Sequence, residues 1–340
     1  MTCAQALLSS EIHLLTGSSR SGRADALLLL AHVLRRPREW LVAHGEAPVC
    51  AEDARAFQTL CRRRAAGVPV AYLIGSTWFW GREFVVNERV LVPRPETEHL
   101  VEDALGFIRG PMRVLDVGTG CGAIACTVAA ETPAVVDATD SSRAAIEVAT
   151  ENARRLGVAE RSRFHHGDLA EPVGTHRYDA VIANLPYIPT NDLPERPAPA
   201  SYEPRAALDG GPDGLALYRR LLVQLPALLN EDALVLLEAA PPTIDDLAQM
   251  LCTSLPNFVI SVHSDYAGLP RYVRARSPAV EGVRTASAAS ESGRSQEGER
   301  PENRAPARAR SASQAPDAAV CVFGGRAAAQ RQVSERTRAK

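Results

Sequence analysis

Hydrophobic positions recur at helical spacing in the first part of the chain. The apolar run over residues 26–34 ends before Pro37, and residues 53–64 carry their apolar side chains three or four positions apart. We therefore predict a small helical domain over residues 1–70. Nothing in it suggests catalysis, so two interpretations stay open, a module that only packs on a larger domain and one that recognises a substrate or partner.

Between residues 71 and 95 the pattern changes to short aromatic and apolar runs. Runs at 78–80, 83–87 and 90–92, with Gly81 near one turn, predict a β-hairpin. We expect this hairpin to link two domains, with its aromatic side chains as packing residues.

From residue 96 to residue 276 helical and strand-like patterns alternate. Helices are expected from 94 to 108, after the glycine-rich turn at 118–122, and at 141–156, 215–229 and 243–251. Strands are expected at 113–117, 134–140, 161–167, 178–182, 233–238, 258–263 and 271–276. The alternation predicts an α/β domain with a mostly parallel sheet. The short link at 265–270 forces the last two strands to be antiparallel.

After residue 277 large apolar side chains become rare, and Ser, Ala, Arg, Glu, Gly and Pro dominate. Such a segment cannot bury enough surface to offset the entropy of ordering, so we predict a disordered tail over 277–340. Its arginines alternate with glutamates and lack aromatic neighbours, which favours a solvated tail over nucleic-acid binding.

Composition narrows the class of protein. A chain of 340 residues with 46% hydrophobic content can form one large core and a smaller domain. The net charge of -2 gives no general reason to expect a polyanionic partner. The seven cysteines form no CxxC pair and no zinc-like spacing, which indicates free thiols in a reducing compartment and no metal.

The first residues lack the basic-then-apolar order of a signal peptide, and no apolar run approaches the roughly 18 residues that span a bilayer. We therefore expect a cytoplasmic protein without membrane attachment.

The turn after the strand at 113–117 is the first candidate for chemistry. It reads Gly118-Thr119-Gly120-Cys121-Gly122, and its glycines allow a ligand to approach the backbone closely. The next strand ends in Asp140, about 20 residues further on, where a ribose diol is held in such folds. No Gly-Lys-Ser/Thr follows, so S-adenosylmethionine, which has a ribose but no phosphate, fits better than NAD or ATP. Asp168 and Leu169, just past another strand end, either lie near the adenine or are plain turn residues.

The second candidate is the end of the strand at 178–182. It runs into Ala183-Asn184-Leu185-Pro186-Tyr187. The Asn184 side-chain oxygen and the Leu185 carbonyl can accept both hydrogens of a planar NH2 group, and Tyr187 can stack on that group. Positioning of this kind supplies on the order of 7–11 kcal/mol, against about 1 kcal/mol for one hydrogen bond. A strand that merely ends in an Asn-Pro turn is the alternative. The proline-rich loop at 188–212 that follows is either a lid over the site or an ordinary surface loop.

Five stretches together resemble the HemK-type release-factor glutamine N5-methyltransferases. They are residues 69–75, 92–98, 115–120, 184–188 and 202–204, and the likeness extends from residue 1 to about 276. It implies a Rossmann-like, S-adenosylmethionine-dependent methyltransferase domain with a seven-stranded sheet, preceded by a small helical substrate-recognition domain. It also implies that the substrate is the glutamine in the Gly-Gly-Gln loop of peptide chain release factors.

The resemblance assigns roles to the two candidate stretches. Asn184 and Tyr187 are the expected catalytic residues, and residues 184–187 are expected to grip the glutamine amide. The expected cofactor-binding residues are Gly118, Thr119, Gly120, Cys121, Gly122, Asp140, Asp168, Leu169 and Asn184. We expect a monomer that needs no metal.

Two positions depart from the family pattern. Leu185 stands where the family usually has proline, which preserves the carbonyl but removes rigidity. Glu238-Ala239-Ala240 replaces the more usual Glu-x-Gly.

Three other functions stay open. A glutamine of a ribosomal protein is one alternative substrate. An adenine N6 in RNA or DNA also presents a planar NH2 group, although the near-neutral charge and the lack of a basic, aromatic stripe weigh against it. A non-catalytic cofactor-binding adaptor is disfavoured by the presence of Asn184 and Tyr187.

Overall fold

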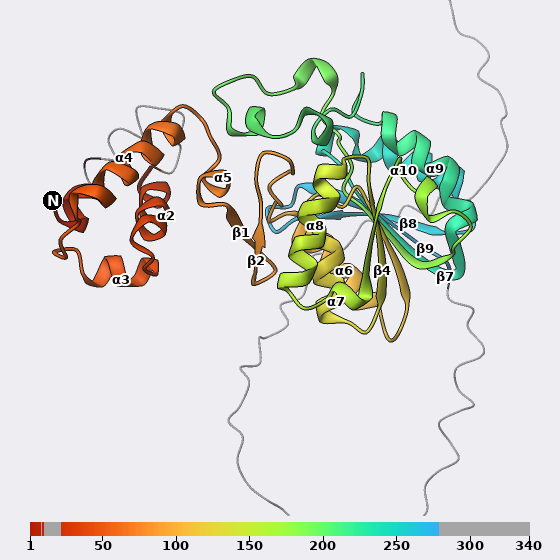
Figure 1. Ribbon diagram of the computed structural model, residues 1–340. Coiled ribbons are helices and arrows are strands. Elements are labelled where there is room, and N and C mark those ends of the chain that lie inside the picture. The colour runs from red at the N-terminus through yellow and green to blue at the C-terminus, as the bar shows by residue number, and fades with distance from the viewer. Residues whose placement is uncertain (8, 10–21, 279–340) are drawn as a thin grey trace, which may run out of the picture.

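The computed structural model describes residues 1–7, 9 and 22–278 of the chain. A group of helices at the N-terminus stands to one side of a larger α/β domain, and a short hairpin lies between them (Figure 1). The predicted disorder of 277–340 lies outside the described residues, apart from the first two positions of that range.

The N-terminal helices enclose a core of their own. They are α2 (Gly22–Leu34), α3 (Arg38–Ala43), α4 (Ala51–Ala65) and α5 (Val70–Ile74). Leu29, Leu30 and Phe57 are completely buried in this core, and an ion pair of 2.7 Å joins Asp25 to Arg64. The helices α2 and α4 agree with the sequence pattern, whereas α3 and α5 are too short to show a helical period.

The linker contains a two-stranded hairpin that turns at Gly81. Strand β1 (Ser76–Phe79) pairs antiparallel with β2 (Arg82–Val85). The run at 90–92 is not part of the hairpin, and beyond the hairpin the side-chain amide of Asn152 takes both backbone hydrogen bonds of Val85, at 2.8 and 3.0 Å. Residues 90–92 pack without a strand partner, and the Val90 carbonyl accepts a hydrogen bond from the Tyr72 hydroxyl.

The larger domain is built on a seven-stranded sheet in the order β5-β4-β3-β6-β7-β9-β8. The strands are β3 (Arg113–Val117), β4 (Val135–Asp140), β5 (Ser162–His166), β6 (Tyr178–Ala183), β7 (Leu229–Glu238), β8 (Val259–Ser264) and β9 (Pro270–Arg276). The first five pair in parallel, while β9 is antiparallel to both β7 and β8. The predicted fold class and the antiparallel edge are confirmed.

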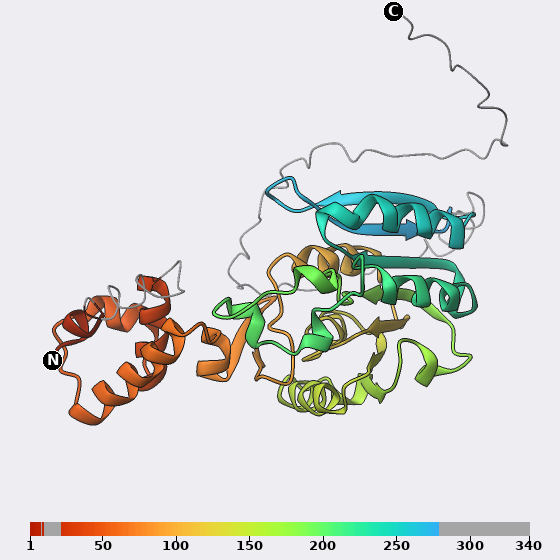
Figure 2. The same ribbon diagram turned by 90° about the horizontal axis from the view of Figure 1, so that it is seen from above.

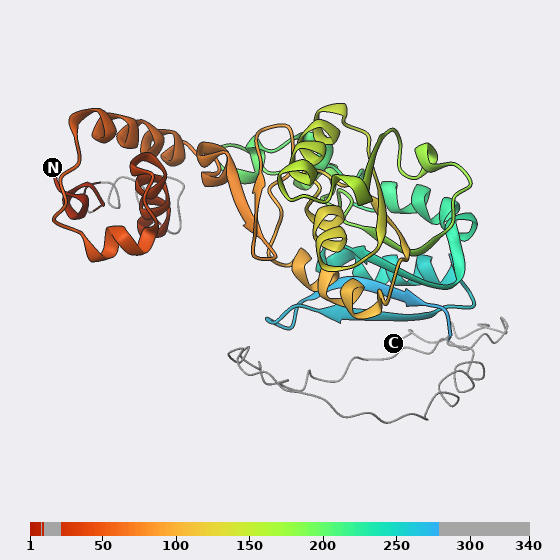
Figure 3. The same ribbon diagram turned by 60° about the horizontal axis from the view of Figure 1, so that its bottom comes forward.

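Helices cover both faces of the sheet, which gives three layers (Figures 1 and 3). Helices α6 (Thr97–Phe107), α7 (Ala123–Glu131) and α8 (Arg143–Arg155) pack on one face, and α9 (Ala216–Leu228) and α10 (Ile244–Ser254) pack on the other. Val114 belongs to the first core and Leu115 to the second, because successive strand side chains point to opposite faces.

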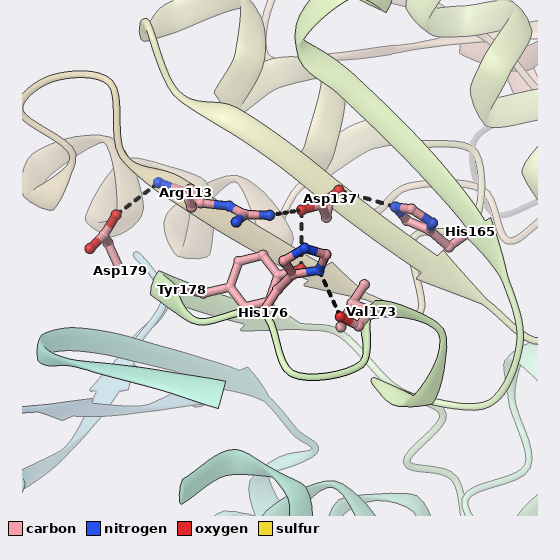
Figure 4. A network of polar contacts seen from close by, with 7 residues as sticks. All are labelled: Arg113, Asp137, His165, Val173, His176, Tyr178 and Asp179. Atoms are coloured by element: carbon pink, nitrogen blue, oxygen red, sulfur yellow. Dashed lines mark hydrogen bonds and ion pairs between the residues drawn. The ribbon is translucent and has the colours of Figure 1, made fainter. Parts of the chain in front are cut away.

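A polar network crosses four of the five parallel strands on one side of the sheet (Figure 4). Arg113, His165 and Tyr178 all hydrogen-bond the buried carboxylate of Asp137, at 3.0 to 3.1 Å. Burial opposes ionisation of this carboxyl group, but the three hydrogen bonds outweigh burial and lower the pKa of Asp137. The network fixes the register of β5, β4, β3 and β6, and it contains none of the predicted site residues.

The loop over 188–212 is ordered and reaches back to the N-terminal helices (Figure 2). The Tyr202 hydroxyl donates to the Ala66 carbonyl at 2.6 Å, just past the end of α4. A Cβ atom on Gly67 would overlap the Pro197 carbonyl oxygen, so the two segments touch closely. The loop is also held on the linker, because Arg94 donates to the buried Glu203 carboxylate at 2.7 Å. It therefore connects three parts of the chain.

Among the helices that the structure describes, none combines the length and the apolarity needed to cross a bilayer.

Candidate functional site

The glycine-rich turn leaves β3 and is fastened to the neighbouring strand. The N–H groups of Gly118 and Thr119 both donate to the Thr139 carbonyl at 2.9 Å. Gly118, Gly120 and Gly122 have φ angles of +77°, +56° and +83°, values that side chains other than glycine rarely adopt. Glycine at these three positions therefore permits the sharp change of direction from strand β3 to helix α7.

Asp116 supports this turn from below. One of its carboxylate oxygens accepts the Thr119 hydroxyl at 2.6 Å and the Ala125 N–H at 3.2 Å. Its other oxygen is buried and has no hydrogen-bond partner among the described residues. Burial raises the pKa of Asp116 to about 7, although these two hydrogen bonds favour the ionised form.

Asp140 ends strand β4 and faces the same turn. Its two carboxylate oxygens accept the N–H groups of Gly120 and Ser142, at 2.9 and 2.8 Å. Burial raises the pKa of Asp140, and these backbone hydrogen bonds partly compensate. The carboxylate is held in a fixed position at the carboxyl end of the sheet.

A cleft opens at this end of the sheet, with about 820 Å³ of empty space including its open mouth. Of the residues predicted to bind cofactor or substrate, those that line the cleft are Gly118, Gly120, Asp140, Asp168, Leu169, Asn184, Leu185 and Pro186. Four separate strand ends and turns are thus brought together.

The other predicted residues lie outside the cleft wall. Thr119 is buried and bonded to Asp116, Cys121 is buried, and Gly122 packs against helix α8, where a Cβ would lie 3.1 Å from Ala149. Tyr187 is not among the residues that line the cleft. Thr119, Cys121 and Gly122 therefore shape the turn from behind.

Asn184 follows directly on β6 and is oriented by a residue far away in the sequence. Its side-chain NH2 donates to the Thr97 hydroxyl oxygen at 3.0 Å. Among the described residues no hydrogen bond to its side-chain oxygen is present, so that oxygen is available to accept from a ligand. Because Asn184 lines the cleft, the acceptor is placed beside the glycine-rich turn.

Leu185 is fixed more firmly than the sequence alone indicates. Its N–H donates to the Tyr218 hydroxyl at 3.1 Å, and its side chain is buried over Gly118. A Cβ on Gly118 would lie only 2.8 Å from this side chain. The rigidity that proline would supply is replaced by a hydrogen bond and by packing.

Tyr187 is half-buried, and its hydroxyl lies in a charged environment. Burial raises the pKa of Tyr187 to about 12, and the nearby Glu238 carboxyl group adds to the shift. A Cβ on Gly214 would overlap the Tyr187 carbonyl, so the loop before α9 packs directly on this backbone. The ring is held as a neutral phenol at the physiological pH range.

Sequence reasoning missed three residues of the site, Thr97, Tyr218 and Glu238. Thr97 and Glu238 lie within stretches that were noted for their motifs, but only the folded chain brings both beside Asn184. Tyr218 occupies an ordinary core position of helix α9, and nothing in the sequence indicates its hydrogen bonds. A single tyrosine, Tyr218, on an otherwise apolar helix face is the one feature of the sequence that could point to a buried hydrogen bond there.

The chain is similar to known proteins. Two family models match the chain, the PrmC N-terminal domain over residues 6–75 and the methyltransferase small domain over residues 99–193. The release factor glutamine methyltransferase of Bacillus anthracis is 37% identical over 255 residues, which are 72% of this chain and 89% of that protein. The release factor glutamine methyltransferase of Moorella thermoacetica is 40% identical over 277 residues, 80% of this chain and 97% of that protein. Among solved structures, a methyltransferase from Pyrococcus furiosus is 18% identical with a TM-score of 0.45, covering 58% of this chain and 89% of that one.

Proposed function

The chain belongs to the release factor glutamine methyltransferases, and on that premise we propose that it transfers a methyl group from S-adenosylmethionine to the side-chain amide nitrogen of the glutamine in the Gly-Gly-Gln motif of peptide chain release factors. The observation that carries the proposal is the position of Asn184 and Leu185, which both line a cleft formed in part by the glycine-rich turn.

The cleft residues fit S-adenosylmethionine. The Asp140 carboxylate is held where it can accept the two hydroxyls of a ribose, and Gly118 and Gly120 leave room for a ligand against the backbone. Leu169 and Leu185 offer apolar surface for an adenine ring. When bound, this cofactor supplies a methyl group on a positively charged sulfur.

The Asn184 oxygen and the Leu185 carbonyl hold the glutamine nitrogen in this proposal. An amide nitrogen is a weak nucleophile because its lone pair is delocalised, and two acceptors fix both of its hydrogens so that the nitrogen faces the methyl donor. Pro186, which lines the cleft, packs against the flat amide. No strong base is required, since the nitrogen becomes acidic when it forms the new bond and its proton leaves to water.

The N-terminal helices and the loop over 188–212 are proposed to recognise the body of the release factor. The two are joined by the contact between Tyr202 and Ala66, and the loop starts next to Tyr187. The loop lies between the N-terminal helices and the larger domain (Figure 2), so a substrate that touches the helices also meets the segment that starts next to the proposed amide site.

Labelled S-adenosylmethionine tests the proposal directly. We expect the purified chain to label a release factor and to leave its Gly-Gly-Ala variant unlabelled. Ribosomal proteins and ribosomal RNA are incubated in parallel, and label in either of them, with none in the release factor, would overturn the assignment.

Asn184→Ala tests the enzyme side of the proposal, as the Gly-Gly-Ala variant tests the substrate side. We expect transfer to fall at least ~100-fold, the loss typical of a misplaced reacting group, with cofactor affinity retained. Unchanged turnover would remove Asn184 from the mechanism.

A further inference from the structure

Three polar side chains from separate elements meet at the edge of the cleft. Asn184 follows β6, Thr97 begins α6 and Glu238 ends β7. The Asn184 NH2 donates to Thr97 at 3.0 Å, and both Thr97 and Asn184 lie close enough to the Glu238 carboxyl group to act on it and favour its ionised form. Thr97 and Glu238 are buried, and one Glu238 oxygen has no hydrogen-bond partner in the described part of the chain.

The hydrogens in this cluster run in one direction. An ionised carboxylate can only accept, so the Thr97 hydroxyl donates its single hydrogen to Glu238. The Thr97 oxygen is then free to accept from the Asn184 NH2, which is the hydrogen bond present in the structure. This arrangement leaves the oxygen of the Asn184 side chain for the cleft.

We propose that Thr97 and Glu238 are positioning residues that determine which end of the Asn184 carboxamide faces the substrate. The inference rests on the proposed function, because it is the glutamine NH2 that requires an acceptor at this point. Neither Thr97 nor Glu238 lines the cleft, so both act through Asn184.

Protonation of Glu238 reverses the direction of the cluster. A carboxylic acid donates to Thr97, and Thr97 then turns its own hydrogen toward Asn184. Only the oxygen of the Asn184 side chain can accept the hydrogen of the Thr97 hydroxyl. The carboxamide therefore turns over, and its NH2 then faces the cleft. Two NH2 groups opposite each other cannot hydrogen-bond, so the protonated form does not hold the substrate amide.

The surroundings of Glu238 place this change near neutral pH. The pKa of Glu238 is raised to about 7, with burial as the largest cause and the neighbouring Glu96 as a smaller one, while Thr97, Arg271 and Asn184 oppose the shift. Tyr187 and Tyr218 also face this carboxyl group, and both remain neutral phenols because their own pKa values are raised. The acceptor orientation therefore dominates above about pH 7 and is lost below it.

Substitutions at Thr97 test the positioning role. Thr97→Val keeps the shape and removes the hydroxyl, and we expect kcat to fall at least tenfold while KM for S-adenosylmethionine stays unchanged. Thr97→Ser restores the hydroxyl and should recover most of kcat. Thr127→Val is the matched control, since Thr127 is equally buried and its hydroxyl has no partner among the described residues. A Thr97→Val enzyme with the kcat of the Thr127→Val control would overturn the proposal.

The pH profile tests Glu238. In the wild-type chain kcat should fall as the pH drops through about 7, and in Glu238→Gln the fall should disappear while kcat is lower throughout. The pKa of Asp116, beneath the glycine-rich turn, is also raised to about 7. Asp116→Asn is therefore the control, and in it kcat should still fall as the pH drops through about 7. If kcat of Glu238→Gln still fell as the pH drops through about 7, the proposed role of Glu238 would be contradicted.

Hydrogen exchange of the Asn184 side chain separates this inference from the proposed function. The two NH2 protons, assigned by their loss in Asn184→Asp, should exchange slowly at pH 8 and quickly in Thr97→Val. This measurement needs no substrate, so it holds even if the release factor is not methylated. Rapid exchange in the wild-type chain at pH 8 would overturn the orientation of Asn184.

Discussion

The backbone N–H of Leu185 lies 3.1 Å from the hydroxyl oxygen of Tyr218, a residue on helix α9 at a sequence separation of 33. The same hydroxyl donates to the carbonyl of Glu238, at the end of β7. Tyr218 thus joins the ends of two neighbouring strands and holds the peptide group that is proposed to face the substrate. A proline at position 185 would have no N–H to offer.

Tyr218→Phe should destabilise the protein and slow methyl transfer. The change leaves a buried N–H and a buried carbonyl without this partner, which costs about 1–3 kcal/mol. Turnover should fall as well, because the Leu185 carbonyl loses its fixed direction. Urea unfolding and initial rates measure the two effects.

A double-mutant cycle shows whether the Leu185 N–H carries the effect. In a Leu185→Pro background this donor is absent, so Tyr218→Phe should cost less there than in the wild-type chain. Equal costs in both backgrounds would show that the Tyr218 hydroxyl acts only through Glu238.

Gly118→Ala should weaken binding of S-adenosylhomocysteine at least ~10-fold, since a non-glycine residue in this backbone region costs about 1–3 kcal/mol. The added Cβ would also lie 2.8 Å from the Leu185 side chain and so disturb the cleft wall. Gly75→Ala is the control, because Gly75 has a φ of +86° with open space around it. The control should lose stability yet bind as the wild type does, and calorimetry distinguishes the two. Equal affinities in both variants would contradict the prediction.

Stability should fall as the pH rises from about 4.5 to 7. The pKa values of Glu238 and Asp116 are both raised to about 7 by burial, from ordinary values of 4.5 and 3.8. Within this window the folded chain keeps protons that the unfolded chain has released, so each step up in pH favours unfolding. Glu238→Gln removes one of these groups and should flatten the dependence. Urea titrations at several pH values measure it, and an unchanged slope in the variant would show that Glu238 does not contribute.

Gly67→Ala should release the loop over 188–212 from the N-terminal helices. The new Cβ would overlap the Pro197 carbonyl, and the φ of +104° adds strain of about 1–3 kcal/mol. We expect proteases to cut the loop about tenfold faster, in keeping with a change of roughly 1.4 kcal/mol in the local opening equilibrium. Tyr202→Phe removes only the hydrogen bond to Ala66 and should have a smaller effect. A loop cut at the wild-type rate in Gly67→Ala would rule out this contact as a restraint.

The sequence pattern predicts the sheet and its helices well because both depend on local periodicity. The strand over 113–117 and the antiparallel pair at the end of the domain agree with the structure for this reason. The run at 90–92 is not part of the hairpin, and beyond the hairpin Asn152 takes both backbone hydrogen bonds of Val85. A side chain on a distant helix leaves no trace in local periodicity.

The same distinction applies to the site, where some residues could be predicted from the sequence and others could not. Gly118, Asp140 and Asn184 could be found because each follows a strand end, and parallel strands bring those ends to one edge. Thr97 and Tyr218 could not be found, since they reach the site from helices whose register against the sheet depends on tertiary packing. The sequence indicates only that Leu185 gives a less rigid backbone than proline would. It does not indicate the hydrogen bond from the Leu185 N–H to Tyr218 on α9, which restores a fixed position.

The loop that begins at Ile188 is attached at its far end to the last turn of α4, through Tyr202 and Ala66. A displacement of the N-terminal helices that keeps this hydrogen bond therefore pulls on the backbone between Tyr187 and Tyr202. Under the proposed function, a partner that docks on the helices in a wrong orientation also displaces the residues that are proposed to bind its amide. The proposed function thus implies selection of the whole partner, and not only of its reactive residue, through this one loop.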